Sequence, residues 1–491
     1  MLTRLKIDGF KNLIGVDVSF GPFTCIAGAN AVGKSNLFDA IFFLSDLTEK
    51  SFYEAAISIR GDGKSGDADY IKSLFFSDDG INHRHMKFEA EFIIPPTGID
   101  KLRQPLKATI TFLKYALTLR LREDDWDPAG PVALESESLT YITQSDAKKH
   151  LPFVAGNSPW IKSVITGKRS GGPFISTESK DSSDESEGSI IRLHQDGGKR
   201  GKPIGINASK TPRTLLSATN FENPTALLAK QEMRSWRRLQ LESSAMRQPD
   251  DRTAPARISA NGGHLAKTLY SLDEPANEIA DKDDIPGNYS LLSQRLSELL
   301  DDVHEIKVDI DKHRNMMTLM VAGKDRAYYP ARSLSDGTLR FLALGILELS
   351  NSSEVLCLEE PENGIHPTRI GAMLQLLRDI AVDIEEPIDL DNPLRQVIVN
   401  THSPGVVEKL DATELVVADI AINEKKTVRK IARFAPVGID TWRSRAHPDI
   451  RPVTLTSLVD YLTYSDRTRI QETENTSIKQ LIESQLKLNL D

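Results

Sequence analysis

The chain has 491 residues, of which 39% are hydrophobic and 27% are charged, and its formal net charge is −9. This composition fits a globular chain of about three domain-sized units with buried cores, and the negative charge excludes a uniformly basic surface but not a local basic patch. Because no run of about 18 apolar residues occurs and no secretory segment opens the chain, we expect a cytoplasmic protein that does not bind membranes.

A phosphate-binding motif follows the first expected strands. Residues 22–27 (PFTCIA) form a short apolar run that predicts a buried strand, and residues 28–35 (GANAVGKS) match G-x-x-x-x-G-K-[ST]. The helix expected from Lys34 would direct its positive N-terminal end at the phosphates. In this motif Lys34 contacts the β and γ phosphates, and the hydroxyl of Ser35 binds Mg²⁺. The flanking strand and helix argue against a chance glycine-rich turn, so we predict ATP binding here.

The middle of the chain contains strands followed by a stretch without a clear motif. Alternating apolar and polar residues between about His85 and Thr143 predict an antiparallel lobe. From about 150 to 300 we expect a compact, mainly helical insertion, with helices over 225–242 and 289–303. A serine-rich acidic segment near 176–189 predicts a surface loop.

Two basic clusters in this stretch are candidates for contact with nucleic acid or a partner protein. The first cluster lies in a glycine-containing loop and comprises Lys199, Arg200, Lys202, Lys210 and Arg213. The second cluster lies on an expected helix and comprises Arg234, Trp236, Arg237 and Arg238. Solvated, salt-bridged side chains are the alternative interpretation of both clusters.

Two carboxylates end a later apolar run. After strands expected over 304–310 and 316–322, residues 355–358 (VLCL) predict a buried strand that leads into Glu359 and Glu360. Neighbouring strand side chains face opposite ways, so we assign Glu359 to Mg²⁺ and Glu360 to the attacking water, which a carboxylate can orient or deprotonate. Alone, this pattern would indicate an acidic turn, but a phosphate loop in the same chain favours a catalytic site.

Four sequence blocks carry a resemblance to a known family. They span residues 5–36, 333–349 (SLSDGTLRFLALGILEL), 355–367 (VLCLEEPENGIHP) and 397–404 (VIVNTHSP). In order and spacing they resemble the ABC-type AAA ATPases, a group that includes SMC and RecF heads and the ATPase domains of OLD-family nucleases. The resemblance implies an α/β P-loop NTPase fold of ABC-ATPase type, with an antiparallel β lobe and the helical middle insertion.

The resemblance also implies roles for residues outside the phosphate loop. Ser335 and Gly337 match the signature that contacts the γ-phosphate held by a second copy, so two heads would sandwich ATP. His402 matches the switch histidine, and residues 362–364 match the loop that crosses between sites. The expected ATP contacts are Lys11, Asn12, Gly28, Asn30, Gly33, Lys34, Ser35, Asn36, Ser335 and Gly337; the catalytic residues are Glu360 and His402, and the Mg²⁺ ligands are Ser35 and Glu359.

The sequence departs from the family pattern at two points. Many ABC proteins have Asp where this chain has Glu359, and no Gln occurs between Lys34 and Gln104, so the residue that couples the two lobes is unassigned. Cys25 and Cys357, the only cysteines, both lie in expected core strands, and we expect them to be buried and unpaired.

The expected organisation is an N-terminal part of the ATPase head (1–145), the insertion (146–300), a C-terminal part of the head (301–425) and an extension (426–491). No Asp-x-Asp pair follows His402, so the Toprim domain of OLD nucleases is not expected. The resemblance favours an ATPase dimer that controls a separate effector, a nuclease or toxin, like the ATPase subunits of the Septu and PARIS anti-phage systems. One alternative is a RecF- or SMC-like DNA-repair ATPase, which DNA-stimulated turnover would indicate. The other is a nuclease with an unrecognised catalytic domain, which metal-dependent DNA cleavage would reveal.

Overall fold

The computed structural model describes residues 1–459 except 60–67, 79–80, 123–129, 155, 157, 170, 179–188, 197–203, 280–286, 301 and 422–430. Most of the expected acidic loop, the basic residues Lys199, Arg200 and Lys202, and the tail after residue 459 lie outside the described residues. None of the described helices is long and apolar enough to cross a membrane.

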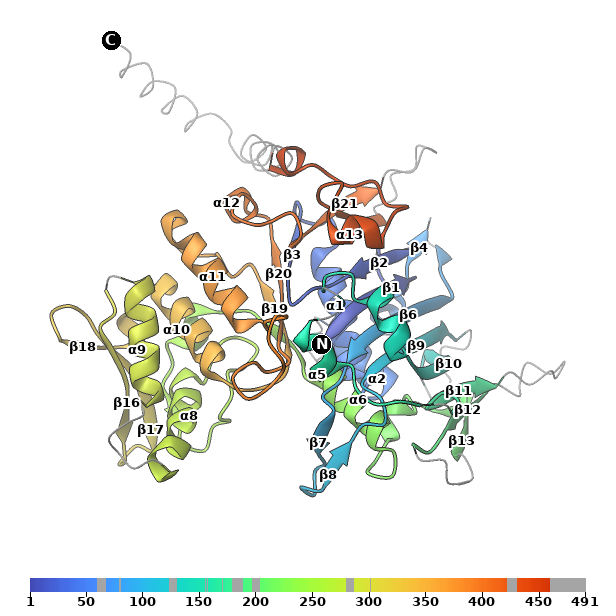
Figure 1. Cartoon of the computed structure of the whole chain (residues 1–491), viewed down its shortest axis with the longest axis horizontal. Coiled ribbons are helices and arrows are strands. Elements are labelled where there is room, and N and C mark those ends of the chain that lie inside the picture. The colour runs from blue at the N-terminus through green and yellow to red at the C-terminus, as the bar shows by residue number, and fades with distance from the viewer. Residues whose placement is uncertain are drawn as a thin grey trace, which may run out of the picture.

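A six-stranded sheet lies at the centre of the molecule (Figure 1). Its strand order is β14, β19, β20, β3, β21, β22, and all neighbours are parallel except β21 and β22. The strands are, in that order, Trp236–Leu239, Val355–Glu359, Gln396–Thr401, Phe23–Ala27, Leu415–Ala421 and Ile431–Pro436. Every residue of β3 and β20 is buried, as expected for strands covered on both faces.

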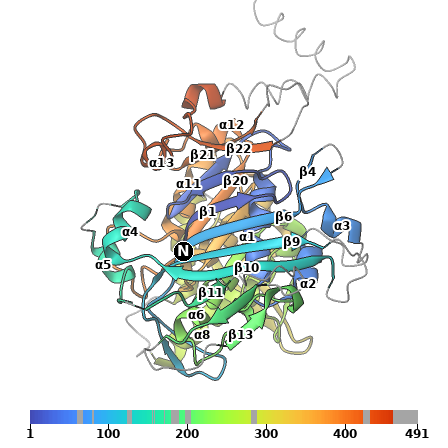
Figure 2. The same ribbon diagram turned by 90° about the vertical axis from the view of Figure 1, so that its right-hand side faces the viewer.

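An eight-stranded antiparallel sheet covers one side of this central sheet, and Figure 2 shows its long strands β6, β9 and β10 side by side. Its order is β13, β12, β11, β10, β9, β6, β1, β2. These strands are Ile204–Asn207, Ile190–Leu193, Ile175–Glu178, Val132–Tyr141, Phe112–Leu121, His85–Ile93, Leu2–Asp8 and Val16–Ser19. The antiparallel lobe predicted between His85 and Thr143 is confirmed.

Two hydrophobic cores flank the central sheet. One core joins the antiparallel sheet to α1 (Lys34–Asp46) and to Ile26 and Cys357 of the central strands. The other core joins Cys25 and Leu356 to helices on the opposite face, which are α8 (Leu265–Ile279), α9 (Asn288–Leu299), α10 (Asp336–Leu349) and α11 (Ile370–Ile380). Cys25 and Cys357 are buried and unpaired, as predicted, and they belong to different cores.

A small sheet packs beside α8 and α9, and the other elements are short. The small sheet consists of β15 (Asp250–Asp251), β16 (Glu305–Asp311), β17 (Met316–Ala322) and β18 (Tyr328–Pro330). The short helices are α2 (Phe52–Ser58), α3 (Ala68–Lys72), α4 (Gln144–His150), α5 (Pro159–Val164), α6 (Pro224–Arg234), α7 (Ser243–Met246), α12 (Pro404–Val407) and α13 (Trp442–Ala446). Two hairpins pair β4 (Ser77–Asp78) with β5 (Ile81–Asn82) and β7 (Thr97–Ile99) with β8 (Pro105–Lys107).

The structure corrects part of the prediction for the middle of the chain. The helix expected over 225–242 ends at Arg234, and the next residues form β14, which pairs with β19. Strands β11 to β13 also extend the antiparallel sheet, so residues 146–300 supply strands to both sheets as well as helices. The boundaries at 145, 300 and 425 stay predictions. Strand β21 lies between β3 and β22, and β22 forms the edge of the central sheet.

Candidate functional site

The phosphate loop connects β3 to α1. At Gly28 a Cβ atom would lie 2.3 Å from the carbonyl oxygen of Ala418, and at Gly33, where φ is 113°, it would lie 2.7 Å from the Cβ of Ala432. Both positions therefore require glycine, Gly33 also because of its left-handed backbone. No described side chain caps α1, and its first turn holds no acidic residue. Its first N–H groups are thus suited to an anion.

Lys34 begins α1 and points back over the loop. Its Nζ donates to the carbonyl oxygens of Gly28, at 2.6 Å, and Ala29, at 2.7 Å. Burial lowers the pKa of Lys34 to about 8, although the carboxylates of Glu360 and Glu362 act to raise it. A phosphate would provide the counter-charge that this desolvated ammonium needs. Ser35 is partly exposed in the same turn, and Asn30 is exposed in the loop.

Lys11 and Asn12 lie against α1. The Oδ1 of Asn12 accepts a hydrogen bond from the Nδ2 of Asn36 at 2.8 Å, and the Nζ of Lys11 lies 2.7 Å from the Oδ2 of Asp39. The side chain of Asn12 also lies 3.0 Å from the position of a Cβ on Gly33. The structure thus brings this predicted polar pair to the phosphate loop, while their contact with nucleotide stays a prediction.

The two acids at the end of β19 point in different directions. Glu359 ends the strand, and its side chain lies on the same face of the sheet as Cys357. Helix α1, whose first turn contains Ser35, covers this face. Mg²⁺ is commonly held by one or two carboxylates together with substrate phosphates and waters, so Ser35 and Glu359 form a suitable donor set. Among the described residues no group of three or more His, Cys, Asp or Glu side chains could hold a metal.

Glu360 is hydrogen-bonded to His402. The Nδ1 of His402 lies 2.7 Å from Oε1 of Glu360, and the Nδ2 of Asn363 donates to Oε2 at 2.9 Å. The hydrogen bond from His402 is the main reason that the pKa of Glu360 falls to about 2, and the same bond raises the pKa of His402. The backbone of Glu360 is left-handed, with φ of 45°, and its N–H donates to Asn400. A carboxylate with so low a pKa is a weak base but can orient a water molecule.

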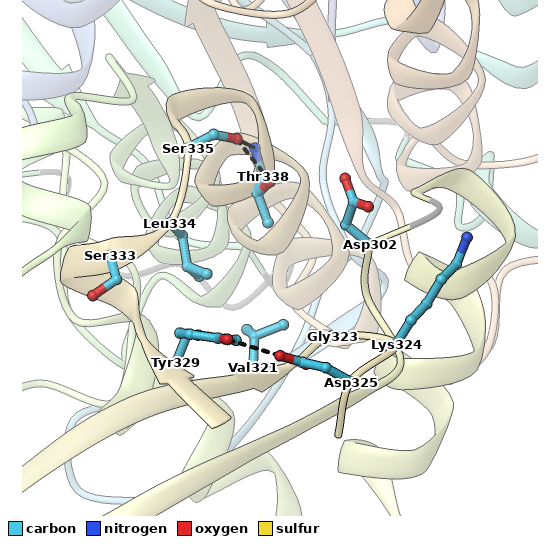
Figure 3. A pocket seen from close by; sticks show the side chains of 10 residues that line it. All are labelled: Asp302, Val321, Gly323, Lys324, Asp325, Tyr329, Ser333, Leu334, Ser335 and Thr338. Carbon is cyan, nitrogen blue, oxygen red and sulfur yellow. Dashed lines mark hydrogen bonds between the residues drawn. The ribbon is translucent and has the colours of Figure 1, made fainter. Parts of the chain in front are cut away.

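The predicted signature lies on the other side of the central sheet from α1. Ser335 caps α10, where its Oγ accepts a hydrogen bond from the N–H of Thr338, and α10 belongs to the core opposite the one that contains α1. Gly337 packs against the crossing loop, because a Cβ there would lie 3.2 Å from the carbonyl oxygen of Gly364. Figure 3 shows Ser335 at the rim of a cavity of about 530 Å³ that Lys324 and Tyr329 also line.

Two residues, Gln240 and Arg238, were not placed at this site by the sequence analysis. Gln240 directly follows β14, at the carboxyl edge of the sheet beside β19, and is exposed. It is a candidate for the coupling glutamine that the sequence pattern left unassigned. Arg238 had been assigned to a partner surface, but its Nε lies 3.4 Å from Oε1 of Glu359. Both placements depend on the parallel pairing of β14 with β19, and no local sequence motif indicates this pairing.

Most residues of the second basic cluster are therefore not available to contact nucleic acid or a partner protein, and the prediction is wrong for them. Trp236 is buried, and its indole N–H donates to Glu232. Arg237 pairs with the buried Glu354 at 3.0 Å, and Arg238 pairs with Asp39. Only Arg234 keeps a half-exposed side chain. Because side chains alternate between the two faces of a strand, the residues of β14 point into the two cores instead of to solvent.

Comparisons with known proteins give one family match and several similar structures. The family described as "AAA domain, putative AbiEii toxin, Type IV TA system" matches residues 23–185 and 181–408. An SMC head bound to the C-terminal winged-helix domain of ScpA has a TM-score of 0.45 at 12% identity, covering 88% of this chain and 97% of the other. The SMC head domain of Thermotoga maritima has a TM-score of 0.37 at 12% identity, covering 89% and 99%. An SMC head bound to the C-terminal domain of ScpA from Pyrococcus furiosus has a TM-score of 0.42 at 11% identity, covering 89% and 96%. No protein of curated function matches the sequence significantly.

Proposed function

The chain belongs to this family of AAA domains and has the α/β fold of a P-loop ATPase with an antiparallel sheet, and from this premise we propose that it hydrolyses ATP between two copies of itself and so controls a separate effector protein. The observation that supports hydrolysis best is the proximity of Lys34, Glu360 and His402. Glu360 and Lys34 each shift the pKa of the other, and both shift the pKa of His402, although Glu360 and His402 come from motifs far from the phosphate loop in sequence. A phosphate-binding cation and a water-orienting carboxylate thus share one site.

In the proposed reaction each group acts on a different part of the nucleotide. Lys34 and the first N–H groups of α1 bind the β and γ phosphates. Mg²⁺, when held by Ser35 and Glu359, would neutralise charge on the same phosphates. Glu360 orients the attacking water, and His402 keeps that carboxylate ionised and fixed in direction. Catalysis would therefore depend on positioning and charge rather than on a strong base.

The second copy would supply Ser335 and Gly337 to the γ-phosphate. The position of α10 and α1 on opposite faces of the central sheet supports this arrangement. Assembly would then be linked to ATP, and such linkage is a means of controlling an effector. We propose a nuclease or toxin as that effector, in anti-phage defence, because of the resemblance to the ATPase subunits of the Septu and PARIS systems.

The test of the site begins with Lys34→Ala. The variant should bind a fluorescent ATP analogue about 100-fold more weakly than wild type and should release no phosphate, because a buried charge-assisted contact is lost. Lys50→Ala is the matched control, since Lys50 follows the same helix and contacts only the surface groups of Asp46 and Ser58 among the described residues. Equal ATP affinity of wild type and Lys34→Ala would contradict the proposed binding site.

ATP binding should also take up protons in mildly alkaline solution. The pKa of Lys34 is about 8, so near pH 8 about half of these side chains are neutral, and bound phosphates raise the pKa. Calorimetric titrations at pH 8.5 in two buffers of different ionisation enthalpy should therefore give different apparent enthalpies. Lys34→Arg, which stays protonated, should abolish most of this difference. Equal enthalpies for wild type in the two buffers would contradict the low pKa.

A further inference from the structure

A single guanidinium joins two elements of the nucleotide site. The Nη2 of Arg238, on β14, donates to Oδ1 of Asp39 on α1 at 2.5 Å. Its Nε lies 3.4 Å from Oε1 of Glu359 on β19. Its Cζ lies 4.7 Å from the ring centroid of Phe42, one turn further along α1. Arg238 therefore contacts the helix that follows the phosphate loop and the strand that carries the proposed metal acid.

Strand register and helix periodicity bring these groups together. Arg238 pairs in register with Cys357, two residues before Glu359, so both charged side chains lie on the face of the sheet that α1 covers. On α1, Asp39 lies one turn after Ser35 and on the same side of the helix. The guanidinium thus links the turn next to Ser35 with Glu359, and these two residues are the proposed Mg²⁺ ligands.

The charges in this cluster balance. The side chain of Asp39 is fully buried, with Lys11 at its Oδ2 and Arg238 at its Oδ1. A buried carboxylate is stable as an anion only with such partners. The contact between Arg238 and Glu359 is an ion pair without a hydrogen bond, so it attracts the carboxylate towards β14 without itself occupying the oxygens that a metal would bind.

We infer that Arg238 is a positioning residue for the magnesium site: by binding Asp39 and Glu359 together, it sets the separation between the Ser35 turn of α1 and the end of β19. The inference rests on the proposed function, because that function assigns Ser35 and Glu359 to Mg²⁺. It predicts a specific effect on the metal rather than a general effect on nucleotide or on stability.

The test compares Arg238→Met with Arg237→Met. Arg237 precedes Arg238 on β14 but faces the other core, where it pairs with Glu354. Its loss therefore removes an even more deeply buried cation, away from the nucleotide. Binding of a fluorescent ATP analogue is measured in EDTA and then as Mg²⁺ is added. For Arg238→Met we expect about 10-fold more Mg²⁺ at half-saturation, the size typical of a lost neighbour of a metal ligand, with affinity in EDTA unchanged within about twofold.

Two further variants serve as controls for the inference. Arg237→Met should match the wild-type Mg²⁺ dependence even if its unfolding temperature falls. Arg238→Lys keeps the charge but reaches only one carboxylate, so it should give an intermediate shift, and it replaces the Met variant if that variant does not fold. Three results for Arg238→Met would overturn the inference but not the proposed function. They are a Mg²⁺ dependence like that of wild type, tighter Mg²⁺ binding, and a loss of ATP affinity in EDTA as large as the loss with Mg²⁺. A wild-type protein that binds no ATP would overturn the proposed function and this inference with it.

Discussion

Replacing Glu360 by glutamine should leave a protein that still binds ATP but hydrolyses it at least about 100-fold more slowly than wild type. Glutamine keeps the size of the side chain, and its oxygen can still accept the hydrogen bond from Asn363. It loses the negative charge that pairs with His402 and that we propose to orient the attacking water. Phosphate release in single-turnover experiments separates this loss from any change in ATP binding.

The control for Glu360→Gln is Glu385→Gln, which removes an exposed carboxylate. The control should hydrolyse ATP at the wild-type rate. Because the pKa of Glu360 is about 2, the carboxylate is ionised throughout the usual assay range, so lowering the pH to 5 should not reproduce the variant. Turnover by Glu360→Gln within twofold of wild type would show that another group orients the water.

Mixing two inactive variants should restore activity if the signature acts in trans. Ser335→Arg places a long cation where the γ-phosphate would dock but leaves the phosphate loop of its own chain intact, and Lys34→Ala leaves the signature intact. In a mixed dimer one of the two sites has both Lys34 and Ser335. With random pairing at equal concentrations, the mixture should therefore reach about a quarter of wild-type turnover.

A second mixture serves as the matched control for this prediction. Lys34→Ala and Glu360→Gln both damage the same half of a site, so their mixed dimer contains no intact site and should stay inactive. ATP binding by Ser335→Arg alone should match wild type. If the first mixture stays inactive at every ratio although mixed dimers form, Ser335 does not complete a neighbouring site.

The parts of the site that could be predicted from sequence are those that short segments determine. The apolar run before Gly28, the fixed spacing to Lys34, and the acids after residues 355–358 each specify a local structure, and the central strands appear where these patterns place them. The position of His402 beside Glu360 was available only from the resemblance, because it depends on β20 lying next to β19.

The prediction failed where side-chain direction depends on a distant strand. Residues 225–242 have the composition of one helix, but Trp236 and Leu239 fill opposite cores once β14 pairs with β19. The same pairing turns Arg238 to the nucleotide site and brings Gln240 to the carboxyl edge of the sheet. A register between segments more than 100 residues apart has no local signature, so sequence periodicity could not place either side chain.

The strand order of the central sheet also constrains how the protein is made. Strand β3, which leads into the phosphate loop, has β20 and β21 as its two neighbours, and these begin at Gln396 and Leu415. At translation rates of about 5–20 residues per second, the ribosome needs roughly 20–70 s to reach them after β3 has been made. Until then β3 has neither partner strand, and the glycines of the loop lack the neighbours at Ala418 and Ala432 that pack against them. Nascent chains therefore expose an apolar strand for most of synthesis, and the ATP site forms only near its end.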